Sequence, residues 1–383
     1  MLNTRHFVDA LRARGVRLFA GVPDSLLASL STTLMQSERK DEHIITANEG
    51  NAVALAMGHY LATGRPAVVY MQNSGLGNTV NPVSSLADPE VYGIPMLFIV
   101  GWRGEPGHKD EPQHVKQGRI TEGQLDLLDI PHWIVDQDSD AEALLDAAWQ
   151  AMTARGGPVA LLVRAGAFDD VKFTPPAHPL GWPEGLAPLR REAAIARVLE
   201  LLAPEDIVLA TTGKTGREVF ELRAGAGQAQ RDFLTVGGMG HTASIALGIA
   251  LARPERRVVC LDGDGSMLMH LGATAIVGDL APANLVHVLL NNQSHESVGG
   301  QPTVAGRIDF AGIARACGYA AYHSARELDG IAAVFGALPA QAGPVLIEIH
   351  LWQGARKDLG RPTSTPQQNK AAFMAHIGSA PAG

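Results

Sequence analysis

Residues 258–292 read VVCLDGDGSMLMHLGATAIVGDLAPANLVHVLLNN, and this stretch indicates how the second half of the chain folds. Two apolar runs, Val258–Leu261 and Leu285–Leu290, flank a segment with a helical pattern. Nearly continuous apolar strands separated by a helix are typical of a parallel sheet that is covered on both faces. We therefore predict a strand–helix–strand unit, with Gly263-Asp264-Gly265 after the first strand and Asn291-Asn292 after the second.

The same alternation of strands and helices runs through both halves. In the first half the predicted strands are Leu18–Gly21, Ile44–Ala47, Ala67–Met71, Met96–Val100 and Val159–Val163. In the second half they are Ile207–Ala210, Val258–Leu261, Leu285–Leu290 and Val345–Ile349. The proline-rich stretch Phe173–Pro188 between the halves cannot hold a regular helix. We expect an α/β protein with two similar doubly wound parallel-sheet domains, over residues 1–170 and 191–383, joined by a linker at 171–190.

Composition excludes several classes of function. The chain of 383 residues carries a net charge of −8, which argues against nucleic acid as a general partner. It has no run of about 18 apolar residues, and its N-terminus MLNTRHFVDALRARG predicts an amphipathic helix rather than a secretory signal. We expect no membrane association, a cytoplasmic location, and buried free thiols at Cys260 and Cys317.

Oxygen-bearing side chains follow the two strands of residues 258–292. The carboxyl ends of neighbouring parallel strands lie at one edge of a sheet, so Asp264 and Asn292 can reach one point there. Mg²⁺ prefers hard oxygen ligands and usually takes one or two carboxylates plus phosphate oxygens. We predict a metal site formed by Asp264, Asn292 and the backbone carbonyl of Ser294. The tripeptide Gly-Asp-Gly alone would favour a tight turn, and the second strand ending in Asn-Asn at this distance is what favours the metal site.

Small residues beside these ligands suit a diphosphate. Gly263 and Gly265 allow close approach of the backbone, and the start of the helix after Ser266 favours negative charge. Thr212 and Gly213 follow another predicted strand, and the backbone amides there could cradle a phosphate, although the spacing is not that of a P-loop.

The signature Gly-Asp-Gly followed by Asn-Asn resembles that of the thiamine-diphosphate enzymes. This resemblance implies that Asp264 and Asn292 bind the metal that anchors the cofactor diphosphate. It also implies that Glu49, in Asn48-Glu49-Gly50-Asn51-Ala52, activates the cofactor by a hydrogen bond to N1′ of its pyrimidine ring. Without the resemblance, Glu49 would be an acid in the first turn of a helix, where it complements the helix dipole.

Residues Gly237-Gly238-Met239-Gly240-His241 resemble the segment that holds this cofactor in its bent form. The resemblance assigns the Gly237 carbonyl to the 4′-amino group and Met239 to the apolar wedge; the alternative is a glycine-rich start of the predicted helix His241–Ala252 with a core methionine. In these enzymes the activating glutamate and the metal site come from different subunits. A homodimer or a larger homo-oligomer, with active sites at the subunit interface, is therefore implied.

The length of the chain leaves room for the two cofactor domains and for no inserted middle domain. This is similar to the short branch of the superfamily that contains phosphonopyruvate and sulfopyruvate decarboxylases. The segments that resemble phosphonopyruvate decarboxylases are Gly21–Leu27, Tyr70–Asn78, Gly101–Gly107, Asp110–His114 and Ser297–Gln301. The implied reaction is the non-oxidative decarboxylation of 3-phosphonopyruvate to phosphonoacetaldehyde and CO₂ through a thiamine-diphosphate ylide and enamine. The alternatives are sulfopyruvate decarboxylation, a carboligase, and a non-catalytic subunit, which would lack Glu49 or Asp264.

The substrate implied by the resemblance carries a carboxylate and a phosphonate, so the protein would need a local positive site against its overall charge. The basic stretch 102–119 follows a predicted strand, and an arginine there can hold a phosphonate with two hydrogen bonds. We predict that Arg103, Lys109 and Gln113 contact the substrate. Candidates for proton transfer to the enamine are two imidazoles and two groups of the Gly-Val-Pro loop, namely His114, His295, Asp24 and Ser25.

Overall fold

The computed structural model describes residues 1–37, 39–174, 176, 178–338 and 343–378. Positions 175 and 177 of the expected linker, and 339–342 and 379–383 of the expected second domain, lie outside the described residues. Contacts divide the chain into two compact units. Unit 1 comprises Met1–Pro175 and Val298–Gln301, and unit 2 comprises Pro176–Ser297 and Pro302–Gly383.

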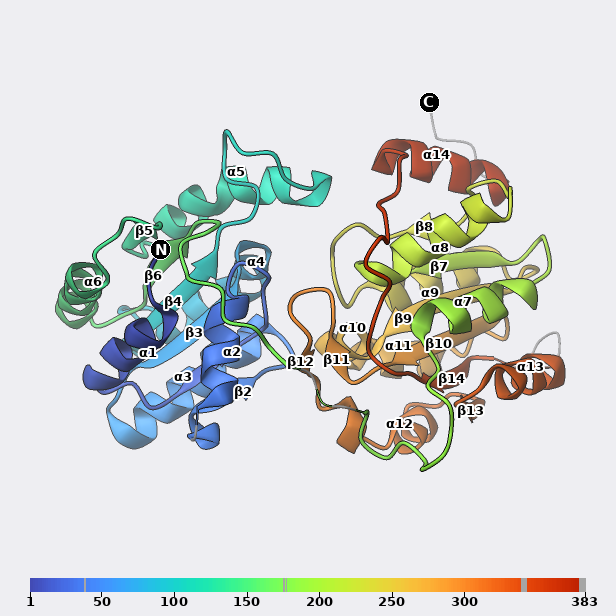
Figure 1. Cartoon of the computed structure of the whole chain (residues 1–383), viewed down its shortest axis with the longest axis horizontal. Coiled ribbons are helices and arrows are strands. Elements are labelled where there is room, and N and C mark those ends of the chain that lie inside the picture. The colour runs from blue at the N-terminus through green and yellow to red at the C-terminus, as the bar shows by residue number, and fades with distance from the viewer. Residues whose placement is uncertain (38, 175, 177, 339–342, 379–383) are drawn as a thin grey trace. The chain divides into compact units, whose positions relative to one another are not determined.

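Unit 1 contains a six-stranded sheet in the order β2-β1-β3-β4-β6-β5, and each pair of neighbouring strands is parallel (Figure 1). The strands are β1 (Phe19–Gly21), β2 (His43–Ile45), β3 (Ala67–Gln72), β4 (Met96–Gly101), β5 (His132–Val135) and β6 (Val159–Val163). The helices are α1 (Thr4–Ala13), α2 (Ala28–Gln36), α3 (Glu49–Thr63), α4 (Leu76–Pro82), α5 (Pro112–Leu127) and α6 (Ala141–Arg155).

Alternate strand residues of unit 1 point to opposite faces of the sheet and form two apolar cores. One core joins residues such as Phe19 and Tyr70 to the buried faces of α1, α2 and α6. The other joins Val69 and Phe98 to α3, α4 and α5. Burial on both faces explains why these strands are nearly continuous apolar runs. It also leaves the carboxyl ends of the strands as the place where polar side chains can gather.

Unit 2 contains a second six-stranded parallel sheet, in the order β13-β14-β10-β9-β7-β8. Its strands are β7 (Ile207–Ala210), β8 (Phe233–Leu234), β9 (Val258–Gly263), β10 (Leu285–Asn291), β13 (Ala321–Ala325) and β14 (Val345–His350). The short strands β11 (Ser294–His295) and β12 (Gln301–Pro302) pair with each other. The helices are α7 (Arg191–Glu200), α8 (Lys214–Gly225), α9 (Thr242–Ala252), α10 (Asp264–Met269), α11 (Gly272–Leu280), α12 (Phe310–Ala316), α13 (Leu328–Ala337) and α14 (Pro366–His376).

Unit 2 also has two apolar cores, one on each face of its sheet. Helices α7, α8 and α13 cover one face of the sheet, and α9 to α12 with α14 cover the other. Counted from the first strand of each unit, and leaving aside β11 and β12, the two sheets have the same strand order. The expectation of two similar doubly wound α/β domains is therefore confirmed.

The sequence prediction missed five strands: the short pair β11 and β12, and three strands of the main sheets, which are β5, β8 and β13. All three lie at sheet edges or are too short to form an apolar run: β8 has two residues, and β13 (AYHSA) is only half-buried. An edge strand needs no continuous apolar run, because one of its sides is open. Within the described residues no helix is both long enough and apolar enough to cross a bilayer.

Candidate active site

The predicted metal ligands lie at the ends of two adjacent strands of unit 2. Strands β9 and β10 pair in register, Leu290 opposite Gly263, so the residues that follow both strands lie at the same sheet edge. Asp264 begins α10, and the backbone N–H of Asn292 donates a hydrogen bond to its carboxylate. The structure therefore brings Asp264 and Asn292 together, and both are buried.

The two asparagines of the Asn-Asn pair have different partners. Asn291 donates from Nδ2 to Glu348 Oε1 (2.7 Å) and accepts from the backbone N–H of Gln293 (3.2 Å), which fixes the end of β10 against β14. The Asn292 side chain points into the loop, where its Oδ1 accepts from the backbone N–H of Ser294 (3.1 Å). The first asparagine is thus structural, and the second contacts Asp264 through its backbone N–H while its side-chain oxygen lies in the loop.

The residues present fit a hard cation and a diphosphate. Asp264, Asn292 and the carbonyl of Ser294 offer oxygen atoms, the ligand type that Mg²⁺ prefers. The buried hydroxyl of Ser294 has no hydrogen-bond partner among the described residues, which is costly unless a ligand group satisfies it. Burial also raises the pKa of Asp264 from 3.8 to about 7, because a charged carboxylate there lacks a compensating cation. Thr303 donates its hydroxyl proton to this carboxylate.

The glycine-rich turn after β9 is closely packed. A Cβ atom added to Gly265 would lie 3.0 Å from His295 Cε1 and 3.4 Å from Met239 Cε, so all three residues meet at one point. Ser266 accepts hydrogen bonds from Thr211 Oγ1 and from the backbone N–H of Gly240, both at 3.1 Å, and thereby joins the turn to the segment that carries Met239 and Gly237. Burial lowers the pKa of His295 to about 4, so its imidazole is neutral at neutral pH.

The predicted phosphate turn lies directly before α8. Gly213 has a φ of +93°, a conformation that favours glycine. A Cβ there would lie 2.6 Å from Ser297 Oγ, which follows the Asn292 loop. Thr212 and Gly213 are partly buried, and the helix that starts at Lys214 gives them the N-terminal position that anions prefer.

Glu49 is the first residue of α3, after β2. The side chain of Asn48 caps this helix by accepting a hydrogen bond from the backbone N–H of Asn51 (2.9 Å), which places Glu49 in the first turn. Its carboxylate is buried and accepts from Asn78 Nδ2 at 2.7 Å. Burial raises the pKa of Glu49, as expected for an acid that can stay protonated and donate to a ring nitrogen.

Other predicted residues of unit 1 form a second polar group after β1 and β4. Asp24 is fully buried and accepts from the backbone N–H of Leu26 (2.9 Å) and from Gln72 Nε2 (2.7 Å). Ser25 is exposed and accepts from Arg103 Nη1 at 2.8 Å. Burial raises the pKa of Asp24. The buried Asp24 carboxylate thus fixes the loop after β1 that presents Ser25 to Arg103.

Asp110 organises the basic stretch. Its carboxylate accepts hydrogen bonds from Arg103 Nε (2.8 Å) and from Arg103 Nη2, and His114 Nδ1 lies 2.9 Å from its Oδ1. Although burial opposes the shift, the hydrogen bonds from Arg103 and His114 hold the pKa of Asp110 well below its usual range. Asp110 therefore offsets part of the positive charge of Arg103. The remaining guanidinium nitrogen, Nη1, donates to Ser25. Gln113 on α5 is partly buried, and Lys109 is exposed.

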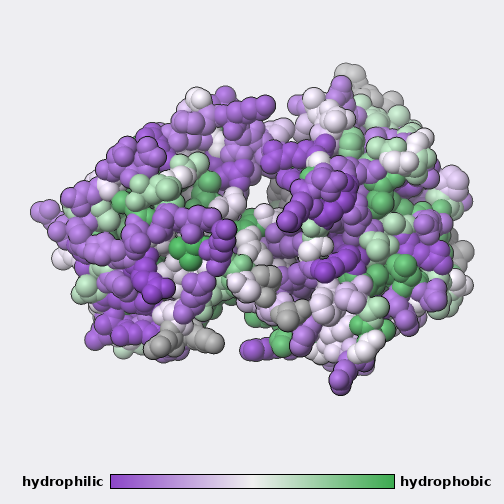
Figure 2. All heavy atoms as spheres, viewed as in Figure 1, coloured by the Kyte–Doolittle hydropathy of each residue, from purple (hydrophilic) through white to green (hydrophobic). Residues whose placement is uncertain are grey.

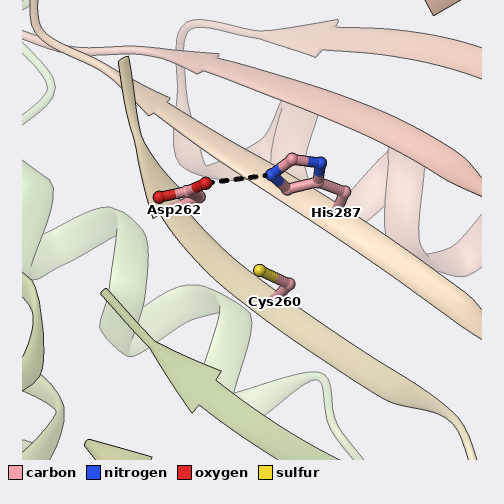
Figure 3. Close-up of side chains that lie close together, drawn as sticks. All are labelled: Cys260, Asp262 and His287. Carbon is pink, nitrogen blue, oxygen red and sulfur yellow. Dashed lines mark hydrogen bonds and ion pairs between the residues drawn. The ribbon is translucent and has the colours of Figure 1, made fainter. Parts of the chain in front are cut away.

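A separate buried cluster lies within the sheet of unit 2 and has a different character. Figure 3 shows Cys260 and Asp262 on β9 beside His287 on β10, with donor atoms within 4.8 Å of one another. His287 Nε2 lies 3.4 Å from Asp262 Oδ2, and His287 Nδ1 lies 3.0 Å from the Tyr319 hydroxyl. Burial raises the pKa of the Cys260 thiol well above its usual value. Sulfur and nitrogen donors do not suit Mg²⁺, so we do not interpret this cluster as the magnesium site. It packs between β9 and β10, the two strands that lead to Asp264 and Asn292.

Both cysteines are free, as expected, but Cys317 is only partly buried. The sequence reasoning missed several side chains that position the site. These are Gln72, Asn78, Asp110, Glu296 and Thr303, which contact predicted site residues. A signal existed for one of them, because Asp110 lies four positions before His114 and just before the start of α5 at Pro112.

Two domain families match this chain. The description "Thiamine pyrophosphate enzyme, N-terminal TPP binding domain" matches residues 2–126, and "Thiamine pyrophosphate enzyme, C-terminal TPP binding domain" matches residues 218–349. The first range holds Glu49, and the second holds Asp264 and Asn292. The chain belongs to the thiamine pyrophosphate enzymes.

Within that family, the similarity extends to particular decarboxylases. The chain is 38% identical to phosphonopyruvate decarboxylase of Streptomyces viridochromogenes, over 100% of this chain and 97% of that protein. It is also 38% identical to phosphonopyruvate decarboxylase of Streptomyces hygroscopicus, over 97% of this chain and 93% of that protein. Sulfopyruvate decarboxylase of Methanosarcina acetivorans is 28% identical, over 95% of each chain. The chain is thus an enzyme of the thiamine-diphosphate-dependent decarboxylase type.

Proposed function

We propose that this enzyme decarboxylates 3-phosphonopyruvate to phosphonoacetaldehyde and CO₂, using thiamine diphosphate and Mg²⁺. The observation that carries the choice of substrate is 38% identity over nearly the full length of two phosphonopyruvate decarboxylases, against 28% for a sulfopyruvate decarboxylase. The oxygen donors around Asp264 and the protonatable Glu49 supply the chemistry that the cofactor requires.

In this proposal, separate groups of residues bind the diphosphate and the pyrimidine ring of the cofactor. When bound, thiamine diphosphate supplies the sink for the electrons released as CO₂ leaves. Asp264, Asn292 and the Ser294 carbonyl hold Mg²⁺ and through it the diphosphate, while the amides around Thr212 and Gly213 contact phosphate oxygens. Glu49, whose pKa is raised by burial, donates a hydrogen bond from its carboxyl group to the pyrimidine ring. Asn78 holds Oε2 and so fixes the orientation of that carboxyl.

The polar group after β1 and β4 provides the substrate end. Arg103 Nη1 and Ser25 Oγ present donors to the phosphonate, with the guanidinium fixed in place by Asp110. Lys109 and Gln113 complete this anion site from the following loop and helix. Asp110 also holds Nδ1 of His114, which leaves Nε2 of that imidazole to deliver a proton to carbon.

Among the four candidate proton donors, the geometry favours His114. Asp24 is fully buried in hydrogen bonds, and the exposed Ser25 is engaged with Arg103. His295 is neutral at neutral pH because of its lowered pKa, so it suits packing against Met239 and the cofactor better than donating a proton. A His114→Gln variant that keeps the wild-type rate and product would contradict this choice.

The active unit in this proposal is a cytoplasmic homodimer or larger homo-oligomer, in which Glu49 of one subunit meets the metal site of another. Supporting this, each unit exposes large apolar side chains on neighbouring helices. They are Leu61 and Val80 on α3 and α4, and Leu251, Ile276 and Leu280 on α9 and α11. Figure 2 shows hydrophobic patches among the mainly hydrophilic side chains of the visible face. Neighbouring exposed apolar residues are a common mark of subunit interfaces.

The decisive experiment measures CO₂ release from phosphonopyruvate and from sulfopyruvate side by side, with and without thiamine diphosphate and Mg²⁺. We expect turnover of phosphonopyruvate that requires both additions, and slower turnover of sulfopyruvate. Preference for sulfopyruvate would reverse the substrate assignment. Product analysis with an added aldehyde acceptor separates simple decarboxylation from carboligation, since a carboligase would consume the acceptor.

A further inference from the structure

Glu296 receives an unusual number of hydrogen bonds for a carboxylate that the sequence analysis left without a role. Its Oε2 accepts from Asn292 Nδ2 (2.9 Å) and from Arg191 Nη1 (2.6 Å). Its Oε1 accepts from Lys214 Nζ (3.2 Å) and from the backbone N–H of Gly354 (3.0 Å). The side chain is only 11% exposed, so these contacts replace water around a charged group.

One of these contacts determines the orientation of a predicted metal ligand. The side-chain amide of Asn292 can be turned over so that its oxygen and nitrogen exchange places, and only the oxygen can bind a cation. A carboxylate accepts hydrogen bonds and repels an amide oxygen, so Glu296 selects the orientation in which Nδ2 faces it. Asn292 Oδ1 is thereby turned to the other side, where it accepts from the backbone N–H of Ser294.

Two positively charged side chains, Arg191 and Lys214, hold the Glu296 carboxylate in position. Arg191 is bound on its other side by Glu218, with Nε and Nη2 at 2.7 and 2.9 Å from the two carboxylate oxygens. Lys214 is the first residue of α8 and directly follows the Thr212-Gly213 turn. Two cations and two anions therefore form a nearly buried, balanced group, and one carboxylate of that group connects the phosphate turn to the metal-ligand loop.

We propose that Glu296 is a positioning residue that sets the Asn292 amide with its oxygen toward the metal and couples this loop to the turn at Thr212–Lys214. The inference rests on the proposed function, because it presumes that Asn292 binds Mg²⁺. Outer-shell partners of this kind tune metal affinity without touching the metal. A merely structural ion pair would instead change the stability of unit 2 and leave metal affinity unaltered.

The test compares Glu296→Gln with Glu218→Gln. Glutamine at 296 loses the charge and can present its own NH₂ group to Asn292, so the amide is free to turn over. We expect the apparent affinity for Mn²⁺ or Mg²⁺ in the presence of thiamine diphosphate to fall about tenfold. Electron paramagnetic resonance of free Mn²⁺ measures this directly, without any turnover. Excess metal should restore the rate, with little change in the substrate KM.

Glu218→Gln is the matched control, because Glu218 shares Arg191 but contacts neither Asn292 nor Lys214 in any described hydrogen bond. It should change metal affinity less than about twofold, although both variants lower the thermal stability of the metal-free protein. Equal metal affinity in wild type and Glu296→Gln would overturn the inference.

A second variant covers the case in which Glu296→Gln does not fold. Lys214→Met removes the partly exposed ammonium group that donates a hydrogen bond to Glu296. It should also weaken metal binding, but by a smaller factor, about threefold. Unaltered metal affinity in Lys214→Met would then contradict the inference. If the wild-type protein itself binds no divalent metal in the presence of thiamine diphosphate, the proposed function fails, and this inference falls with it.

Discussion

Glu49 and Asp264 are both buried acids, and each is the first residue of a helix that follows a strand, but their surroundings differ. Glu49 Oε2 accepts a hydrogen bond from the neutral amide of Asn78. Asp264 accepts from Thr303 and from backbone N–H groups, including that of Asn292, and the buried hydroxyl of Ser294 in the same loop has no partner among the described residues. Burial raises the pKa of both groups.

The same local position therefore supports two kinds of chemistry. At both acids it is burial that raises the pKa, while the donated hydrogen bonds oppose the shift. The two proposed roles differ in what lies nearby. Asn292 and Ser294 offer further oxygen ligands for a cation near Asp264, whereas the described side-chain contact of Glu49 is one amide.

The largest expected effect is on the proton-donor side of this comparison. Glu49→Gln keeps the shape of the side chain but removes its acidic proton, so we expect kcat to fall about 10³-fold while thiamine diphosphate still binds. CO₂ release and cofactor binding, measured separately, check this. Glu90→Gln, at an exposed acid of the same unit, is the control. Full activity in Glu49→Gln would show that the two carboxylates do not differ in the way described.

Asp264→Asn tests the metal side. The change retains an oxygen but removes the negative charge, so we expect the affinity for Mg²⁺ to fall at least about 100-fold, the upper end of outer-shell effects. Calorimetric titration in the presence of thiamine diphosphate measures it. Asp279→Asn, at an exposed aspartate on α11, should bind Mg²⁺ like the wild type. If Asp264→Asn bound as tightly as the wild type, the metal would have to lie elsewhere.

The pH dependence of metal binding sharpens the contrast. Because the folded-state pKa of Asp264 is raised to about 7, the metal-free protein retains a proton there, and Mg²⁺ must displace it. Affinity should rise about tenfold per pH unit below pH 7 and level off above it. The same proton stabilises the metal-free fold at low pH, and this contribution is lost as the pH rises from 3.8 towards 7. Asp264→Asn should abolish both slopes, and a flat affinity profile in the wild type would contradict the assignment.

The smallest expected effect comes from crowding Glu49. A Cβ added at Gly75 would lie close to the Glu49 carboxylate, whereas Gly77 in the same segment has open space around it. Gly75→Ala should therefore displace the carboxyl group and lower kcat about tenfold, an effect of misplacing a positioned group. Gly77→Ala should leave kcat unchanged and slightly stabilise α4. Equal rates in the two variants would mean that the exact place of Glu49 matters little.

Much of the fold was predictable because the central strands are buried on both faces. Their apolar runs identified β3, β4, β6, β7, β9, β10 and β14 with nearly correct bounds. The edge strands β5, β8 and β13 were missed, since their short or mixed sequences are no different from those of loops. The candidate residues Asp264 and Asn292 were predictable for a related reason, since each directly follows a strand, where a parallel sheet gathers polar groups. Glu49 lies four positions after the end of β2, and its candidate role came from the resemblance to thiamine-diphosphate enzymes.

The partners of those residues were not predictable. Asn78 lies 29 positions from Glu49, and Thr303 lies 39 positions from Asp264. Arg191 and Lys214 reach Glu296 from two different helices. Arg103 was predicted to contact the substrate, and nothing in the sequence indicated that Asp110 occupies two of its nitrogens. No local pattern reveals such contacts, because they depend on which strand ends become neighbours.

By itself, then, the amino-acid sequence determined that two parallel sheets form and which side chains stand at their carboxyl ends, because hydrophobic periodicity and turn residues act locally. The tertiary structure decided that both acids are buried with raised pKa values, and that Glu296 accepts hydrogen bonds from Asn292, Arg191 and Lys214. These properties arise from burial and from hydrogen bonds between residues far apart in the chain, so they exist only once the strands are in order.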